Sequence, residues 1–436
     1  MKKSFEELSG NLDAFLAPCL SQDWPNFPVE KAEGVYVYDK KGRQYLDFLC
    51  GFGACNVGHN HPEVVKAAKD QIDKFVHTAI GVTHYEPLIL LTQELKEILP
   101  GNLDMFFFGN SGAEAVEGAL KVARYTSGRS AIISFIGGFH GRTIGATSVG
   151  SSKAKYRTGH GGLLPDIHFC QYPYPYRSRA PEDPEISSKD ALEDLNRIFE
   201  YIVEPKDVAG ILVEPIQGEG GYIFPPKSFL KTLRKICDDH GIYLIFDEVQ
   251  SGFGRTGEWF ASDVYDVYPD IIAIAKAIAN GFPLGATIAN SEIMKKWGAV
   301  SHGTTCGGNP VSCAAALKVI EVIKKENLLE NAKKQGKYLL DKLKELKKRS
   351  TVIGDVRGVG LMTAAEFVKP GTDREPNPEI VKKVLNIAFE NGLLLYPCGH
   401  WSQTIRLIPA LTVTAEQIDK GMSIFSKAVL ATERGI

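Results

Sequence analysis

The sequence predicts an α/β protein, in which helices cover both faces of a mostly parallel sheet and a smaller α+β unit stands beside it. One observation comes from the stretch between about residue 103 and residue 276, where short, nearly continuous apolar runs alternate with helical patterns. Each run is closed by a glycine, an acid or a lysine. The other observation comes from the chain beyond residue 309, where long helical patterns precede strand patterns around one more helix.

The expected elements follow in order along the chain. Alternating apolar residues flank the sequence DKKG (39–42) and predict a β-hairpin. Helical spacing marks residues 61–76 and 86–101, and the second helix is expected to stop at Pro100-Gly101. Buried strands are expected at 105–109, 131–137, 209–215, 242–248 and 270–276. Beyond these, we expect a long surface loop at 173–190, a lysine-rich helix with a solvated face at 325–350, strands at 352–368 and 404–411, and a helix at 379–392.

Composition excludes several classes of protein. The 436 residues are 44% apolar and 23% charged, and 50 Lys and Arg nearly cancel 52 Asp and Glu, so no nucleic-acid partner is expected. No apolar run reaches the roughly 18 residues of a membrane helix, so no membrane partner is expected either. The eight cysteines form no CxxC pair and no Cys/His cluster with zinc spacing. This usage predicts a reduced, cytoplasmic protein without a metal site.

Chemically versatile residues stand where the predicted strands end, which is where open α/β sheets bind ligands. The strand at 105–109 runs into NSGAEA (110–115), which opens a helix. Small residues there leave backbone N–H groups free to bind an anion, although such turns are also routine connections. Asp247-Glu248 and Lys276 follow two further strands. They form either a plain ion pair or the pair that pyridoxal phosphate requires, a lysine amine for its aldehyde and an aspartate for its ring nitrogen.

Six segments of the sequence resemble the class III pyridoxal-phosphate aminotransferases. They are NSGAEA (110–115), GGFHGRT (137–143), VEPIQGEGG (213–221), LIFDEVQSGFGRTG (244–257), AKAIANGFPLGA (275–286) and HGTTCGGNP (302–310). They occur in the family's order, within a resemblance that spans nearly the whole chain. The resemblance implies fold type I, with a large domain around a mostly parallel, seven-stranded sheet and a small α+β domain from both chain ends. The expected boundaries are 1–65 for the N-terminal part of the small domain, 66–325 for the large cofactor-binding domain and 326–436 for the C-terminal part of the small domain.

The resemblance also implies a role for each matching residue. Lys276 is expected to be the catalytic residue, forming a Schiff base with pyridoxal 5′-phosphate and moving protons, while Asp247 pairs with the ring nitrogen. The other expected cofactor contacts are Phe139 and Val249 on the two ring faces, Gln250 near the 3-oxygen, Ser111, Gly112 and Ala113 around the phosphate, and Thr305 from a partner subunit. The sequence barely separates Thr305 from Thr304. A shared threonine implies a homodimer, or a dimer of dimers, whose active sites use both subunits.

Substrate contacts are expected from four further residues. Arg142 and Arg406 match the arginines that bind the distal carboxylate and the α-carboxylate of glutamate or 2-oxoglutarate, and two arginines suit a dicarboxylate. Glu219 matches the glutamate that pairs with the second arginine when the amino donor has no α-carboxylate. Phe52 stands where 4-aminobutyrate aminotransferases have a small aliphatic residue, and His84 stands where they have proline. Both departures border the expected substrate site.

The resemblance therefore implies an aminotransferase that moves the terminal amino group of an ω-amino acid to 2-oxoglutarate, forming an aldehyde and glutamate. The first choice of donor is 4-aminobutyrate, because residues 75–87 and 173–177 look most like 4-aminobutyrate aminotransferases. Amino-acid racemases or epimerases and ornithine- or acetylornithine-type aminotransferases stay open as alternatives. Racemases of the family usually lack an arginine at the position of Arg142 and carry aspartate at that of Glu219. A catalytically silent binding protein of the same fold is the remote alternative.

Overall fold

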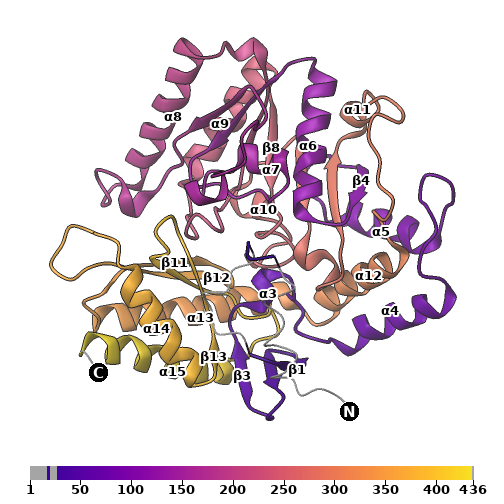
Figure 1. The fold of residues 1–436 in the computed structure, drawn as a ribbon. Helices are drawn as coiled ribbons and strands as arrows, with labels where there is room; N and C mark the ends of the chain where they lie inside the picture. Colours follow the sequence, from indigo (N-terminus) through magenta and orange to yellow (C-terminus); the bar gives the residue numbers. More distant parts are fainter. Residues whose placement is uncertain (1–16, 20–26, 435–436) are drawn as a thin grey trace.

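The computed structural model describes residues 17–19 and 27–434, and its strands form three sheets. Figure 1 shows a large part, the seven-stranded sheet with its helices, above a small part, two four-stranded sheets with the C-terminal helices. Residues 1–16 and 20–26 of the expected N-terminal segment lie outside the described residues. Within the described ranges, no helix has the length and apolar character needed to cross a membrane.

The large sheet has the strand order β4-β10-β9-β8-β7-β5-β6, in which β5 to β9 are parallel and β10 is antiparallel to both its neighbours. The strands are β4 (Met105–Gly109), β5 (Ala131–Phe135), β6 (Ile167–Cys170), β7 (Val208–Val213), β8 (Tyr243–Asp247), β9 (Ile271–Ile274) and β10 (Gly285–Ala289). This is the mostly parallel, seven-stranded sheet expected from the sequence. The expected strands did not include β6 and β10, because β6 is a half-buried edge strand and β10 has few bulky side chains.

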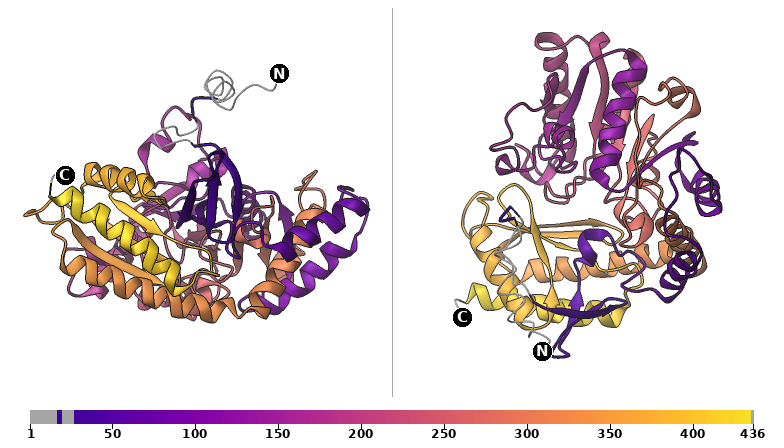
Figure 2. Two further views of the ribbon diagram at one scale, coloured as in Figure 1. Left: turned by 90° about the horizontal axis from the view of Figure 1, so that it is seen from below. Right: turned by 45° about the vertical axis from the view of Figure 1, so that its right-hand side comes forward.

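Helices cover both faces of the large sheet, which explains why its strands are apolar throughout. One face packs against α6 (Gly112–Ser127), α7 (Ile144–Val149) and α11 (Ser291–Met294). The other face packs against α5 (Glu86–Ile98), α8 (Pro184–Tyr201), α9 (Lys227–His240), α10 (Ala261–Tyr265) and α12 (Pro310–Lys325). A further helix, α4 (Pro62–Lys74), packs with α5 against α12, and Figure 2 shows these three helices together at one side of the molecule.

The small part joins the N-terminal strands to the C-terminal region. One sheet contains β1 (Val29–Glu33), β2 (Tyr36–Asp39), β3 (Gln44–Asp47) and β13 (Leu393–Leu394), and β13 pairs in parallel with β3. The other sheet contains β11 (Ile353–Val359), β12 (Met362–Phe367), β14 (Tyr396–Cys398) and β15 (Thr404–Leu407). One apolar cluster packs these strands against α13 (Leu328–Lys348), α14 (Pro378–Glu390) and α15 (Ala415–Glu433). The expected hairpin around DKKG is the antiparallel pair β2 and β3.

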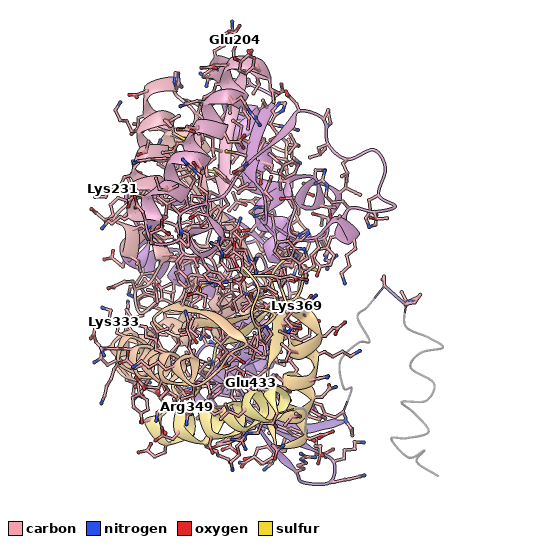
Figure 3. All side chains as sticks on the ribbon, turned by 90° about the vertical axis from the view of Figure 1, so that its left-hand side faces the viewer. Glu204, Lys231, Lys333, Arg349, Lys369 and Glu433 are labelled. Carbon is pink, nitrogen blue, oxygen red and sulfur yellow. The ribbon has the colours of Figure 1, made fainter. Side chains whose placement is uncertain are left out.

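The lysine-rich helix α13 has the solvated face that its sequence predicts. Leu339, Leu343 and Leu346 are buried against the small part, while the lysines between them face solvent. Figure 3 shows Lys333 of this helix pointing outward, where its Nζ makes ion pairs of 3.0 Å with Glu330 and 2.9 Å with Glu258. Exposed pairs of this kind keep a surface soluble and add little stability.

The expected surface loop at 173–190 was wrong over its second half, because α8 begins at Pro184. Asp183 caps this helix by accepting a hydrogen bond of 3.1 Å from the N–H of Glu185. Proline suits the first helical position because its missing N–H would have no partner there. Ser187 and Ser188 are then buried on the inner face of the helix, so polar residues that suggested a loop are part of the packing.

Candidate active site

A cavity of about 470 Å³ lies between the large sheet and the small part. Its wall on the large side stands at the carboxyl ends of β7, β8 and β9, where a ligand site is expected in such a sheet. It is lined by Phe52, Gly112, Ala113, Phe139, His140, Gly141, Arg142, Tyr156, Glu214, Glu219, Asp247, Val249, Gln250, Lys276, Tyr396 and Arg406. The cavity thus brings together every residue expected to contact cofactor or substrate except Ser111 and Thr305. His84, expected to border the substrate site, is exposed and does not line this cavity.

Lys276 lies just beyond the end of β9 and begins a short 3-10 helix, Lys276–Ala279. Its φ of +49° lies in the left-handed region, which costs a non-glycine residue about 1–3 kcal/mol and is typical of functional sites. Burial lowers the pKa of its amine to about 8, against the opposing effect of the Asp247 charge. A sizeable fraction of this amine is therefore neutral near pH 8, and the neutral form is the one that attacks an aldehyde.

Asp247, the last residue of β8, has both carboxylate oxygens held in place. Its Oδ2 lies 2.8 Å from Nδ1 of His140, and its Oδ1 accepts a hydrogen bond of 3.0 Å from the N–H of Val249. Burial would lower the pKa of His140, but the hydrogen bond to Asp247 and its charge raise the pKa overall. The position and orientation of this carboxylate are therefore fixed by its neighbours.

Glu214 follows β7 directly and is buried beside this pair. Burial raises the pKa of Glu214 to about 7. Its two oxygens accept hydrogen bonds of 2.9 Å from the N–H of Phe139 and 2.8 Å from the N–H of Gly218. Glu214 thus ties the segment that carries Phe139 and His140 to the loop that carries Glu219.

The N-terminus of α6 borders the same cavity. Ser111 is the N-cap residue and accepts a hydrogen bond of 3.2 Å from the N–H of Glu114, while Gly112 and Ala113 begin the helix. A Cβ at Gly112 would lie only 2.8 Å from Cγ1 of Val249, so the close approach of the two segments requires glycine. The free N–H groups and positive dipole end of this helix suit a phosphate.

Gln250 carries an unsatisfied polar atom on the cavity wall. Its Nε2 donates a hydrogen bond of 3.2 Å to the carbonyl oxygen of Phe52, but its buried Oε1 has no partner among the described residues. Buried polar atoms in native proteins nearly always have a partner, so this atom indicates a contact to a bound polar molecule.

Glu219 and Arg406 meet at the opposite side of the cavity. Arg406 lies on β15, is 2% exposed, and donates from Nη2 to Oε2 of Glu219 and, at 3.0 Å, to the carbonyl oxygen of Pro397. Its Nε has no hydrogen-bond partner within the described part of the chain. Burial would raise the pKa of Glu219, but the charges of Arg406 and Lys153 lower it. Glu219 and Arg406 are therefore both ionised. The Nε–H group of Arg406 remains available to donate a hydrogen bond to an oxygen atom of a ligand.

Arg142 and Phe52 stand at the edge of the cavity and are exposed. The guanidinium of Arg142 stacks over the ring of Tyr156, 3.6 Å from its centroid. Phe52, in the short helix α3 (Cys50–Gly53), meets the ring of Tyr396 edge to face at 4.9 Å. The guanidinium carbon of Arg406 lies 5.8 Å from each of these two ring centroids and 5.7 Å from that of Tyr222. Aromatic faces thus surround the buried arginine.

Thr305 lies outside this cavity. It borders a second hollow beside Asn110, Glu114 and His302, at the outer side of the α6 N-terminus. Its neighbour Thr304 accepts a hydrogen bond of 3.0 Å from the N–H of Gly307 and so shapes the turn. Neither threonine therefore lines the cavity that contains Lys276.

Residues 20–429 match the family model of class III aminotransferases. The chain belongs to this family. The aminotransferases of this family use pyridoxal phosphate to transfer an amino group from an amine donor to a keto acid. The protein is thus a pyridoxal-phosphate-dependent aminotransferase by family, as the sequence motifs indicate.

Relatives of this aminotransferase include enzymes with two kinds of activity. The chain is 39% identical to an alanine/serine racemase of Pyrococcus horikoshii, over 94% of this chain and 87% of that one. It is 38% identical to a 5-aminovalerate aminotransferase of Pseudomonas aeruginosa, over 98% and 99%, and 38% identical to the 4-aminobutyrate aminotransferase of Escherichia coli, over 92% of each. Among solved structures, an amine transaminase of an uncultivated Pseudomonas species in its PLP-bound form superposes with a TM-score of 0.89 and 32% identity, covering 95% of this chain and 98% of that one.

The residues of the cavity fit pyridoxal phosphate. The N-terminus of α6 offers an anion site, Asp247 offers a fixed carboxylate for a protonated ring nitrogen, and Lys276 offers an amine with a lowered pKa. The orphaned Oε1 of Gln250 offers a polar contact. This donor set is the one that a phosphorylated pyridine aldehyde requires.

Four residues that shape the site were not among the expected site residues. Glu214 could have been found, because it follows a buried strand as Asp247 does. His140 could have been found in the motif GGFHGRT, since a buried polar residue beside Phe139 needs a partner. Lys153 and Tyr156 come from the irregular segment between α7 and β6, and the sequence holds no signal that places them here.

Proposed function

We propose that the protein transfers the terminal amino group of an ω-amino acid, with 4-aminobutyrate as the first choice, to 2-oxoglutarate. The observation that carries this proposal is the pairing of Glu219 with the buried Arg406 inside the cavity of Lys276. With its charge neutralised, Arg406 tolerates a donor that lacks an α-carboxylate. The 5-aminovalerate and 4-aminobutyrate aminotransferases at 38% identity support the same class of donor.

The residues of the cavity divide the chemistry among them. When bound, pyridoxal phosphate supplies an electron sink that stabilises negative charge at the amine-bearing carbon. Lys276 removes a proton from that carbon of the donor and, in the second half-reaction, returns a proton to the corresponding carbon of the acceptor. Asp247, held by His140, would keep a proton on the ring nitrogen, which would strengthen the sink. Phe139 and Val249 would hold the ring, and Ser111, Gly112 and Ala113 would bind the phosphate.

The two half-reactions use the arginines differently. For an ω-amino acid, Arg142 binds the single carboxylate while Glu219 covers Arg406. For glutamate or 2-oxoglutarate, Arg142 binds the distal carboxylate, and Arg406 binds the α-carboxylate through a bidentate ion pair. Phe52 and Tyr396 narrow the space beside Arg406 and select for the shape of the donor.

A second candidate function is amino-acid racemisation, which the 39% identical alanine/serine racemase favours. A racemase needs proton transfer on both faces of the α-carbon and binds one α-carboxylate. The paired Glu219 and Arg406 favour transamination instead, because a dedicated racemase has no need to neutralise its carboxylate site.

A panel of donors tests the proposal. The purified holoenzyme is incubated with 4-aminobutyrate, 5-aminovalerate, ornithine, acetylornithine and alanine against 2-oxoglutarate and pyruvate, and glutamate and alanine formation are measured. We expect the fastest glutamate formation from a short ω-amino acid. Faster interconversion of L- and D-amino acids than transamination of any ω-amine would establish the racemase instead.

We further propose a homodimer in which Thr305 completes the phosphate site of the partner subunit. Its position outside its own cavity supports this, as do the exposed apolar side chains near α4 and α5, namely Ile72, Val76, Val82 and Ile89. Subunits carrying Thr305→Ala and subunits carrying Lys276→Ala are mixed to test it. A shared site regains activity in the mixed dimer, because one site then has both an intact lysine and an intact threonine. No regain of activity would contradict sharing.

A further inference from the structure

Lys153 is a buried lysine that the proposed mechanism does not use. It is 8% exposed, and its Nζ lies 3.3 Å from Oε1 of Glu219. The hydroxyl of Tyr156 donates to the same oxygen at 3.3 Å. The other oxygen of Glu219, Oε2, accepts from Arg406. The carboxylate of Glu219 therefore lies between two cations, one on each oxygen.

The position of Lys153 is fixed by its own neighbours. Its Nζ donates a hydrogen bond of 3.1 Å to the hydroxyl of Ser402, and the preceding Ser152 carbonyl lies 3.1 Å from Nδ1 of His400. Among the described residues, Lys153 makes one ion pair, with the carboxylate of Glu219. Because burial of an unpaired ammonium is costly, the carboxylate of Glu219, whose side chain is 17% exposed, stabilises the charge of Lys153.

The proposed function requires Glu219 to leave Arg406 when an α-carboxylate arrives. A buried carboxylate that loses its only cation must either remain charged at a large cost or take up a proton. Oε1 of Glu219 already contacts Nζ of Lys153 and the hydroxyl of Tyr156. When the carboxylate rotates away from Arg406, its charge therefore stays paired with the ammonium of Lys153.

We propose that Lys153, with the hydroxyl of Tyr156, holds the ionised Glu219 whenever the α-carboxylate of glutamate or 2-oxoglutarate occupies Arg406. This inference rests on the proposed function, since it assigns the second position of the same glutamate. Lys153 acts through Glu219 and is a positioning residue. It lowers the cost of binding an α-carboxylate substrate and leaves ω-amine binding, in which Glu219 stays on Arg406, nearly unchanged.

The inference predicts a change in protonation when Lys153 is removed. The titratable and charged groups around Glu219 are Arg406, Lys153, Tyr156, Tyr222, Lys276, Tyr396 and Cys398, with Arg142 stacked beyond Tyr156. Without the Lys153 ammonium, a displaced Glu219 lacks a cation in contact with its carboxylate. Its pKa then rises through burial, and it takes up a proton as the dicarboxylate binds. A binding step that takes up a proton weakens as the pH rises.

The test uses the holoenzyme and glutarate, an unreactive dicarboxylate with the two carboxylates of 2-oxoglutarate. Binding to wild type, Lys153→Met and Lys155→Met is measured by calorimetry between pH 6 and pH 8, in buffers of different ionisation enthalpy. Lys155→Met is the matched control, because it removes an exposed charge two residues away. For Lys153→Met we expect uptake of close to one proton and a Kd that rises about tenfold more per pH unit than that of wild type across this range. Lys153→Arg should restore binding without proton uptake.

Other outcomes would overturn the inference. Equal weakening of glutarate and 4-aminobutyrate by Lys153→Met, without proton uptake, would mean that Lys153 contacts the substrate carboxylate itself. Behaviour of Lys153→Met identical to that of Lys155→Met would mean that Glu219 needs no second cation. A Glu219→Ser variant separates these failures from a failure of the proposed function. If that variant leaves the preference between ω-amine and glutamate unchanged, the exchange of Glu219 itself is wrong.

Discussion

Asp247 and Glu219 line one cavity, but their surroundings differ. Asp247, at the large-sheet end, is held by one ring nitrogen and one backbone N–H, both on short segments fixed to the sheet. Glu219, at the small-part end, is shared among Arg406, Lys153 and Tyr156, two of which have long side chains with several rotamers. The surroundings of Asp247 keep its carboxylate in one orientation, whereas the surroundings of Glu219 allow its carboxylate two orientations. The large sheet therefore provides a fixed chemical centre, and the small part provides an exchangeable substrate site.

The largest effect is expected at the fixed end. Lys276→Ala should reduce transamination of every donor by about a thousandfold or more, because no other base stands at the reacting carbon. The fold should persist, because alanine removes the charge of Lys276 without removing an apolar side chain from the core. Turnover is followed by glutamate formation and the fold by circular dichroism. Near-normal turnover would remove Lys276 from its proposed role.

Asp247→Asn should lower kcat by about a hundredfold or more for all donors alike. Asparagine fits the space and can still bond His140, but it carries no negative charge to keep the ring nitrogen protonated. His140→Gln is the control, because glutamine preserves a hydrogen bond to Asp247, and it should lose far less. A loss in Asp247→Asn that differed strongly between ω-amines and glutamate would contradict the division between the two ends.

The fold and the fixed end could be largely predicted from the sequence. Continuous apolar strands predict a sheet that is buried on both faces. Asp247 and Lys276 stand at the ends of two such strands, so they lie at the carboxyl edge of the sheet. The edge strand β6 and the small-residue strand β10 lacked that signal. Pro184 was misjudged for a related reason, since a proline that opens a helix looks like a proline in a loop.

The exchangeable end was only partly predictable. Motif positions indicated Glu219 and Arg406, but nothing in the sequence indicated that Lys153 and Tyr156 would reach the same carboxylate. They lie on an irregular segment whose path is set by tertiary contacts, such as the hydrogen bond between Lys153 and Ser402, 249 positions apart. Local patterns carry no information about contacts of that range.

A chemical probe of the fixed end gives the next effect. Because burial lowers the pKa of Lys276 to about 8, a larger fraction of its amine is neutral at pH 7 than for an exposed lysine, by more than about a hundredfold. In the cofactor-free protein, reductive methylation of Lys276 should therefore rise with pH and reach its midpoint near pH 8. Peptide mass spectrometry follows Lys276 and an exposed lysine such as Lys333 together. Equal midpoints for the two lysines would contradict the lowered pKa.

At the exchangeable end, Glu219→Ser should change specificity more than overall rate. Arg406 would then remain unpaired and buried when an ω-amine binds, whereas glutamate would satisfy it directly. We expect kcat/KM for 4-aminobutyrate to fall about tenfold further than that for glutamate, which corresponds to about 1.4 kcal/mol. Steady-state kinetics with both donors measure the shift, and equal losses would make Glu219 a purely structural carboxylate.

The smallest effect is expected from Arg142, which contrasts with the buried Arg406. Arg142 is exposed and stacks on Tyr156, so solvent screens its attraction for a carboxylate. An exposed charge pair contributes up to about 1 kcal/mol, so Arg142→Met should raise KM for both 4-aminobutyrate and 2-oxoglutarate by about threefold to fivefold, with kcat nearly unchanged. Arg406→Met, by comparison, should impair glutamate far more than 4-aminobutyrate, because only the α-carboxylate uses the buried arginine. Initial-rate measurements over a range of each substrate distinguish the two patterns. A loss confined to glutamate in Arg142→Met would mean that the two arginines exchange their proposed roles.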